Sequence, residues 1–163
     1  MKQKNVIEEI KKPLRYMFKG NEKDFEGYIH DNIIEICEGL GLPPVRWIAR
    51  QKTLIRDGVN IRPDIVVRHT DETMTVFEVK KVNEKAPATG ANNQMNAIGQ
   101  LLLYKTILTR QIGAPVRLVL IDNKIYYKTF FTVTDNRLPI TLVELQNDRV
   151  FAPYVGWSEK DGE

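Results

Sequence analysis

Two carboxylates and a lysine stand near the middle of the chain at a spacing that could bring them together. The triplet Arg62-Pro63-Asp64 lies in a β-branched run over residues 60–68, and Glu78-Val79-Lys80 lies in a second such run over residues 73–82. A short polar segment separates the two runs, which is typical of a β-hairpin. We therefore expect the three charged side chains to meet across neighbouring strands.

These residue types suit metal-dependent cleavage of a phosphodiester. Side chains alternate along a strand, so Glu78 and Lys80 share one face and need compensating partners if that face is buried. Mg²⁺ prefers oxygen ligands and commonly takes one or two protein carboxylates. Asp64 and Glu78 meet that need, with the Val79 carbonyl as a third ligand. Lys80 would then orient a metal-bound water or stabilise the charge that develops on the phosphate.

The same residues have a simpler interpretation. Asp64 could begin a strand, and Glu78 with Lys80 could form a solvated ion pair worth about 1 kcal/mol or less. Short motifs of this kind carry a real risk of false matches. Further residues are therefore needed to decide between the two interpretations.

A helix is predicted from Asn21, its N-cap, to Gly39 or Gly41. Its apolar positions follow helical spacing: Phe25, Ile29, Ile33, Ile36, Cys37 and Leu40. Glu22 projects onto the middle of this stripe and Glu26 onto its flank, so a carboxylate is directed at the core side. Alternatively, Glu22 only complements the helix dipole.

A second helix is predicted over residues 96–108, apolar nearly all round and so packed on both sides. Gln100, Leu103, Tyr104 and Ile107 share one of its faces. A glutamine there needs hydrogen-bond partners, which an attacking water, a nucleic-acid backbone or a nearby backbone group could supply.

Together these residues resemble the pattern of the PD-(D/E)XK nuclease superfamily. That pattern has a helix glutamate, Pro-Asp on one strand, Glu-x-Lys on the next, and often a glutamine in a following helix. The matching residues are Glu22, Asp64, Glu78, Lys80 and Gln100. Residues 22–40 and 99–104 are similar to the nuclease domain of archaeal and actinobacterial mismatch endonucleases. The sequence differs from that subgroup in its longer 83–95 segment and in lacking a separate N-terminal DNA-binding domain.

The resemblance implies a restriction-endonuclease-like fold, a mixed β-sheet flanked by α-helices, and a Mg²⁺ site that Mn²⁺ can also fill. Asp64 and Glu78 would hold the metal and Lys80 would assist the nucleophile. Glu22 would bind the metal directly or through water, and Gln100 would orient the site. Glu26 competes with Glu22 for the role of helix glutamate.

Composition and charge fit a small nucleic-acid enzyme. The chain has 163 residues, 42% hydrophobic, and a net charge of +3, so we expect one domain over residues 1–163. A basic arm (1–19) would precede the core (20–131), and a C-terminal extension (132–163) would follow it. The residues expected to contact nucleic acid are Arg50, Lys52, Arg62, Lys81 and Tyr104, although scattered cations are usually a solvated surface.

Other features set the expected surroundings of the protein. Cys37 is the single cysteine, which excludes an intrachain disulfide and suits a reducing cytoplasm. No apolar run reaches transmembrane length, so no membrane contact is expected. A homodimer or a partner protein is attractive because no separate recognition domain is visible.

The rest of the chain is expected to complete the sheet. Residues 83–93 predict a loop, residues 115–121 and 124–131 two strands, and residues 141–145 and 150–157 an edge strand with an aromatic tail. The functional expectation is a Mg²⁺-dependent nuclease, most simply a DNA endonuclease. The alternatives are a binding module without turnover on the same fold and an RNA-directed nuclease.

Overall fold

The described part of the chain is built around one mixed β-sheet. The computed structural model describes residues 5–7, 21–56, 58–82, 86–146 and 149–157. Seven strands form the sheet, in the spatial order β1-β9-β8-β7-β6-β5-β2, and β3 and β4 form a separate ribbon. The elements in chain order are β1 (Asn5–Ile7), α1 (Glu22–Asp31), α2 (Ile33–Gly39), β2 (Val45–Arg50), β3 (Leu54–Arg56), β4 (Val59–Ile61), β5 (Ile65–His69), β6 (Met74–Val79), α3 (Pro87–Ile112), β7 (Val116–Asp122), α4 (Tyr127–Asp135), β8 (Ile140–Gln146) and β9 (Arg149–Tyr154).

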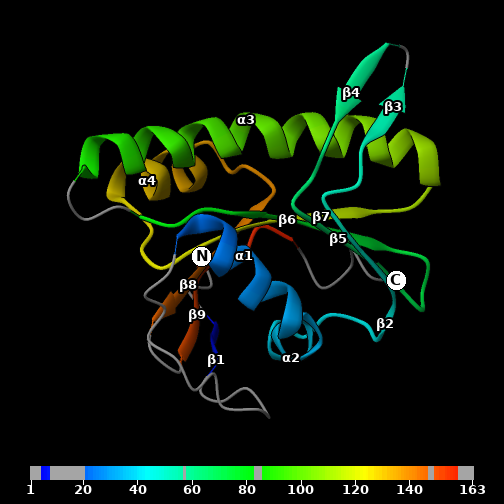
Figure 1. The fold of residues 1–163 in the computed structure, drawn as a ribbon, viewed down its shortest axis with the longest axis horizontal. Helices are drawn as coiled ribbons and strands as arrows, with labels where there is room; N and C mark the ends of the chain where they lie inside the picture. The colour runs from blue at the N-terminus through cyan, green and yellow to red at the C-terminus, as the bar shows by residue number, and fades with distance from the viewer. Residues whose placement is uncertain (1–4, 8–20, 57, 83–85, 147–148, 158–163) are drawn as a thin grey trace.

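Helices cover both faces of the sheet (Figure 1). On one face, α1 and α2 pack in an apolar cluster that includes Phe25 and Phe77. On the other face, α3 and α4 pack in a second cluster that includes Leu101, Val133 and Val76. The neighbours Val76 and Phe77 thus serve different cores, as the alternation of side chains along a strand requires. The expected mixed sheet between helices is confirmed.

The central strands follow the predicted connection. β5 and β6 form the antiparallel hairpin, with Ile65 opposite Phe77. α3 then carries the chain back, so that β7 runs parallel to β6 with Leu120 opposite Glu78. Parallel neighbours need such a crossover. β6 is buried along its whole length, so Glu78 lies inside the protein.

The segment after β7 differs from the prediction. Residues 124–131 were expected to form a strand, but Tyr127–Asp135 form α4. Thr129 and Val133 are buried one helical turn apart, and the Tyr126 amide donates to the Gln94 side chain at 3.2 Å. Tertiary contacts therefore outweigh the β propensity of the aromatic residues.

The first helix begins as predicted and then breaks. Asn21 Oδ1 accepts from the Asp24 amide at 2.9 Å, and the Asp24 carboxylate accepts from Asn21 in return, which completes a capping box. The helix stops at Asn32, so α1 and α2 are separate elements. α2 ends at Gly39, and Gly41 turns the chain in a left-handed conformation with φ 71°.

Helix α3 is longer than predicted. It starts at Pro87, a residue favoured in a first turn, so the loop predicted over residues 83–93 is wrong from Pro87 onward. Residues 83–85 lie outside the described part. The strand predicted over residues 141–145 is confirmed within β8, but it lies between β7 and β9 and is not an edge.

Other expectations concern the ends of the chain and its surroundings. Of the basic arm expected over residues 1–19, only Asn5–Ile7 is described, as a strand paired with β9. Cys37 is buried, and burial raises the pKa of its thiol to about 12, so it serves as a small apolar residue. Among the described residues, no helix is long and apolar enough to span a membrane.

Candidate functional site

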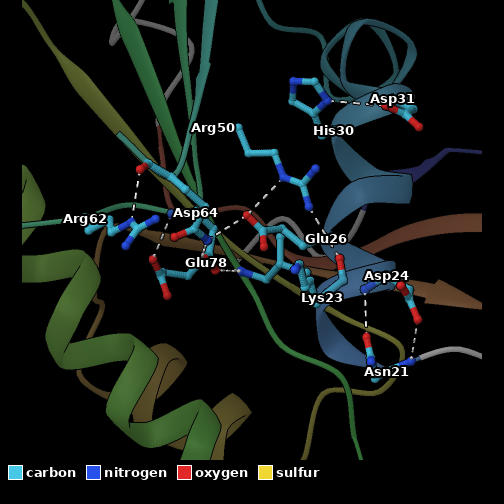
Figure 2. A network of polar contacts seen from close by, with 12 residues as sticks. Asn21, Lys23, Asp24, Glu26, His30, Asp31, Arg50, Arg62, Asp64 and Glu78 are labelled. Atoms are coloured by element: carbon cyan, nitrogen blue, oxygen red, sulfur yellow. Dashed lines mark hydrogen bonds and ion pairs between the residues drawn. The ribbon is translucent and has the colours of Figure 1, made fainter. Parts of the chain in front are cut away.

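The structure brings the two predicted carboxylates together where β5 begins and β6 ends. The Val79 amide donates to Asp64 Oδ2 at 2.8 Å, and the Asp64 amide donates to Glu78 Oε1 at 3.3 Å. Lys80 Nζ lies 3.9 Å from Glu78 Oε2. Figure 2 shows Asp64 and Glu78 beside each other, across from α1. The geometric expectation for these three side chains therefore holds.

Strand geometry explains how Asp64 reaches this place. The pairing of β5 with β6 stops at Ile65 opposite Phe77. Beyond that pair, the Asp64 side chain accepts the hydrogen bond of the Val79 amide. The next amide, of Lys80, points the other way and donates to Ile121 at 2.9 Å. In an extended strand the N–H and C=O of one residue point to the same side. We therefore expect the Val79 carbonyl to face the Asp64 side, as a third metal ligand would require.

Burial makes the charges of this pair costly. Glu78 is only 3% exposed, and burial, followed by the negative charge of Asp64, raises the pKa of Glu78 to about 8 although Lys80 opposes the shift. Burial also raises the pKa of Asp64, against the hydrogen bond from the Val79 amide. A cation between the two carboxylates would offset this cost.

Tyr104 from α3 lies next to this pair and not on the surface. Tyr104 is 6% exposed, and burial, followed by the negative charges of Glu78 and Asp64, raises the pKa of its hydroxyl. We expected Tyr104 among the nucleic-acid contacts. Because its ring is buried, it cannot stack on a base. Tyr104 lies beside the two carboxylates instead.

Of the two helix glutamates, Glu26 lies closer to the site. Glu26 is 7% exposed, and its negative charge acts on the pKa of Asp64. Glu22, the first choice from sequence, is exposed and accepts a 3.3 Å hydrogen bond from the Lys81 amide. The structure thus favours Glu26 as the residue that adds negative charge beside Asp64.

Gln51 is a site residue that the sequence analysis missed. Its Nε2 donates to Glu26 Oε1 at 2.7 Å and to Asp64 Oδ1 at 2.8 Å. The backbone of Gln51 is left-handed with φ 53°, a conformation that costs a non-glycine residue about 1 kcal/mol or more. A backbone hydrogen bond from the Gln51 amide to the Asp64 carbonyl, 3.0 Å, holds it there. No periodic pattern marks such a residue, because it lies between strands.

The predicted glutamine Gln100 lies on the exposed side of α3. Within the described residues, no hydrogen bond joins it to Asp64 or Glu78. The expectation that this helix is packed on both sides is wrong, since Gln100 and Leu103 are exposed while Tyr104 is buried. The buried glutamine of α3 is Gln94, whose side chain is hydrogen-bonded to Asp122 and Thr129.

Two of the four predicted cations, Arg50 and Arg62, contact residues of the site. Arg50 Nε lies 3.5 Å from Glu26 Oε1, and the exposed Arg62 donates from Nε to the Gln51 carbonyl at 3.0 Å. Lys52 Nζ lies 5.2 Å from the centre of the Trp47 ring. Lys81 follows Lys80 at the end of β6 and reaches Glu22 through its amide. These cations could hold phosphates beside the site.

The capacity for metal depends on a small set of oxygens. In the parts of the chain that the structure describes, no group of three or more His, Cys, Asp or Glu is placed to hold a metal ion. Asp64 and Glu78 are two adjacent carboxylates, the first partly buried and the second buried, and their oxygens are hard donors that fit Mg²⁺ with its retained waters.

Comparisons of the chain with protein-family models, curated proteins and solved structures gave no match. The functional argument is therefore made from the chemistry of the site.

Proposed function

We propose that the protein is a Mg²⁺-dependent nuclease of the PD-(D/E)XK type, with a restriction-endonuclease-like fold, that hydrolyses phosphodiester bonds in DNA. The observation that carries this proposal is the meeting of Asp64 and Glu78 beside Lys80 at one strand junction. Two adjacent carboxylates with raised pKa values, one buried (Glu78) and one partly buried (Asp64), are costly in a purely structural role, and such arrangements concentrate at functional sites.

The residues take distinct roles in this proposal. Asp64 and Glu78, with the Val79 carbonyl, would hold Mg²⁺, which supplies an acidified water and neutralises charge on the phosphate. Lys80 would donate from Nζ to the attacking water or to a phosphate oxygen, because it lies beside Glu78 and is partly exposed.

Two further residues would keep Asp64 in place. Val79 fixes one carboxylate oxygen through its amide, and Gln51 fixes the other while it holds Glu26 close. A fixed carboxylate needs no rearrangement when the metal and phosphate arrive, and such preorganisation is a main source of catalytic stabilisation. Glu26 would add negative charge or a water-mediated contact to the metal.

The four predicted cations, Arg50, Lys52, Arg62 and Lys81, support a polyanionic substrate. Arg50, Lys52 and Arg62 are exposed, and Lys81 is partly exposed. Each cation that neutralises a phosphate adds affinity that does not depend on sequence. DNA, which the resemblance also implies, is therefore the substrate that we test first.

The test is cleavage of supercoiled plasmid, linear duplex, branched DNA, single-stranded DNA and RNA with Mg²⁺, Mn²⁺ or EDTA. Wild type is compared with Glu78→Ala and with Asp31→Ala, whose side chain is exposed at the end of α1. We expect metal-dependent cleavage of DNA that only Glu78→Ala abolishes. Cleavage of RNA alone would replace the DNA assignment. Absence of cleavage on every substrate would reject the nuclease and leave a binding module.

A further inference from the structure

The β3–β4 ribbon leaves the main sheet and projects past α3 (Figure 1). Its strands are antiparallel, with Leu54 opposite Ile61 and Ile55 opposite Asn60. Leu54 and Ile61 anchor its base in the core cluster of α3. Ile55 is 68% exposed, so the core of this protein does not account for its apolar side chain.

Both strands of the ribbon are joined directly to the candidate site. The chain enters β3 from Gln51 and Lys52, and it leaves β4 through Arg62 and Pro63 to Asp64. Side chains alternate along a strand, so Ile55 and Asn60 lie on one face of the ribbon, and Arg62 would continue that face towards Asp64. All three residues of this face are exposed.

The length and charge of the ribbon fit a nucleic-acid duplex. Asp64 follows Gly58 at the turn by six residue steps, which at about 3.3 Å per step limits the reach to roughly 20 Å, or about six base pairs at 3.4 Å each. Residues 51–62 carry three cations, Lys52, Arg56 and Arg62, against the single acid Asp57. Residues 51–62 therefore have a net positive charge, and Arg62 contributes its charge on the face that carries Ile55 and Asn60.

We propose that the β3–β4 ribbon binds in the major groove of double-stranded DNA beside the scissile phosphate, with Ile55 against base edges and Arg62 on the backbone. The B-form major groove, about 12 Å wide, admits a two-stranded ribbon, and apolar side chains contact its thymine methyl groups. The major groove of A-form RNA is too narrow for this contact. This inference deepens the proposed function, because it names B-form duplex DNA as the substrate class.

The test measures binding without cleavage. Fluorescence anisotropy in EDTA follows a labelled duplex of about 21 base pairs, two helical turns, and an RNA duplex of the same length. The variant is Ile55→Ser, and the control is Ile34→Ser, a 50% exposed isoleucine on α2. We expect Ile55→Ser to weaken DNA binding by about 5- to 20-fold, while Ile34→Ser changes it less than about 2-fold and RNA binding is equal for all three proteins.

Several results would overturn the inference. Equal affinity of wild type and Ile55→Ser for the DNA duplex would do so, as would the absence of duplex binding by the wild type. A wild-type dimer in light scattering that Ile55→Ser dissociates would assign the ribbon to a second copy of the chain instead.

A cross-linking measurement covers the case in which Ile55→Ser does not fold. A photoreactive group is attached to an Ile55→Cys variant, in which the native Cys37 is buried and stays unlabelled. Cross-links to major-groove positions within about six base pairs of one another on a duplex support the inference, and labelled protein that binds the duplex without cross-links contradicts it.

Failure of the inference and failure of the proposed function are distinguishable. Duplex binding that depends on Ile55 in a protein that cleaves nothing would reject the nuclease and keep the ribbon contact. Metal-dependent cleavage of single-stranded DNA, equal in wild type and Ile55→Ser, without duplex binding would keep the nuclease and reject the ribbon contact.

Discussion

The side chain of Asp64 takes the place of a backbone carbonyl as the hydrogen-bond acceptor for the Val79 amide. The Val79 amide donates to Asp64 Oδ2 at 2.8 Å at the point where the pairing of β5 with β6 has ended. Burial raises the pKa of the same carboxylate. The Asp64 side chain therefore both accepts a structural hydrogen bond and carries a titratable charge. A useful variant keeps the hydrogen bond and removes the charge.

Asp64→Asn keeps an acceptor for the Val79 amide and removes the charge. We expect a folded protein whose Mg²⁺-dependent plasmid cleavage falls by about 100-fold or more, because a metal ligand and its charge are lost. Cleavage rates are measured beside thermal unfolding. Asp31→Asn, at an exposed site, should cleave like the wild type. Full activity in Asp64→Asn would remove Asp64 from the metal site.

The two helix glutamates can be separated by matched variants. Glu26→Gln removes the negative charge that acts on the pKa of Asp64, and Glu22→Gln removes a charge that is hydrogen-bonded to the Lys81 amide. We expect a loss of cleavage rate of about 10-fold or more for Glu26→Gln and less than about 3-fold for Glu22→Gln. Initial rates at saturating Mg²⁺ measure the difference. The reverse order would restore Glu22 as the helix glutamate.

The stability of the metal-free protein should fall as pH rises. The pKa of Glu78 rises from its usual 4.5 to about 8, so the folded state holds a proton that the unfolded chain releases. The stabilisation is complete below about pH 4.5 and is lost progressively up to about pH 8, with a slope of up to about 1.4 kcal/mol per pH unit. Urea unfolding in EDTA between pH 5 and 8 measures the slope.

A neutral variant tests the source of this pH dependence. Glu78→Gln keeps an acceptor for the Asp64 amide and cannot titrate, so its stability should vary less with pH than that of the wild type. Added Mg²⁺ should stabilise the wild type at pH 8 and leave Glu78→Gln unchanged, since a ligand stabilises the state that binds it. An unaltered slope in Glu78→Gln would assign the titration to another group.

The sheet around the site was largely predictable from sequence, because local signals agree with the fold there. Two β-branched runs with a polar turn became β5 and β6, and Asn21 caps α1 as predicted. The segment 124–131 misled the prediction, because its aromatic residues favour a strand in isolation. Contacts of α4 with Gln94 on α3 decide its conformation, and no short-range pattern encodes them.

Only the site residues that lie on the strands were predictable from sequence. Asp64, Glu78 and Lys80 lie on adjacent strands, where alternation fixes the direction of side chains. The choice of Glu22 used one helical phase through residue 40, but the break at Asn32 gives α1 its own phase. Gln51 acts from a left-handed turn between strands, for which the sequence offers no periodic signal.

Gln94 and Gln100 of α3 provide the last prediction, which separates a structural role from a functional one. Gln94 is fully buried, donates to Asp122 Oδ2 at 2.8 Å and accepts from Thr129 Oγ1 at 2.7 Å. Gln94→Leu should lower the free energy of unfolding by about 3 kcal/mol, because both partners would be left buried without it. Gln100→Leu, at an exposed position, should change it by less than about 0.5 kcal/mol.

Cleavage rates of the same two variants then test the resemblance. Asp122 already has a pKa raised to about 6 by burial, and loss of the Gln94 donor would raise it further, so the effect of Gln94→Leu on stability should grow as pH increases past 6. If Gln100 orients substrate, Gln100→Leu loses cleavage rate at unchanged stability. Unchanged rate and stability in Gln100→Leu would show that the exposed glutamine has no part in the reaction and that the site is complete without it.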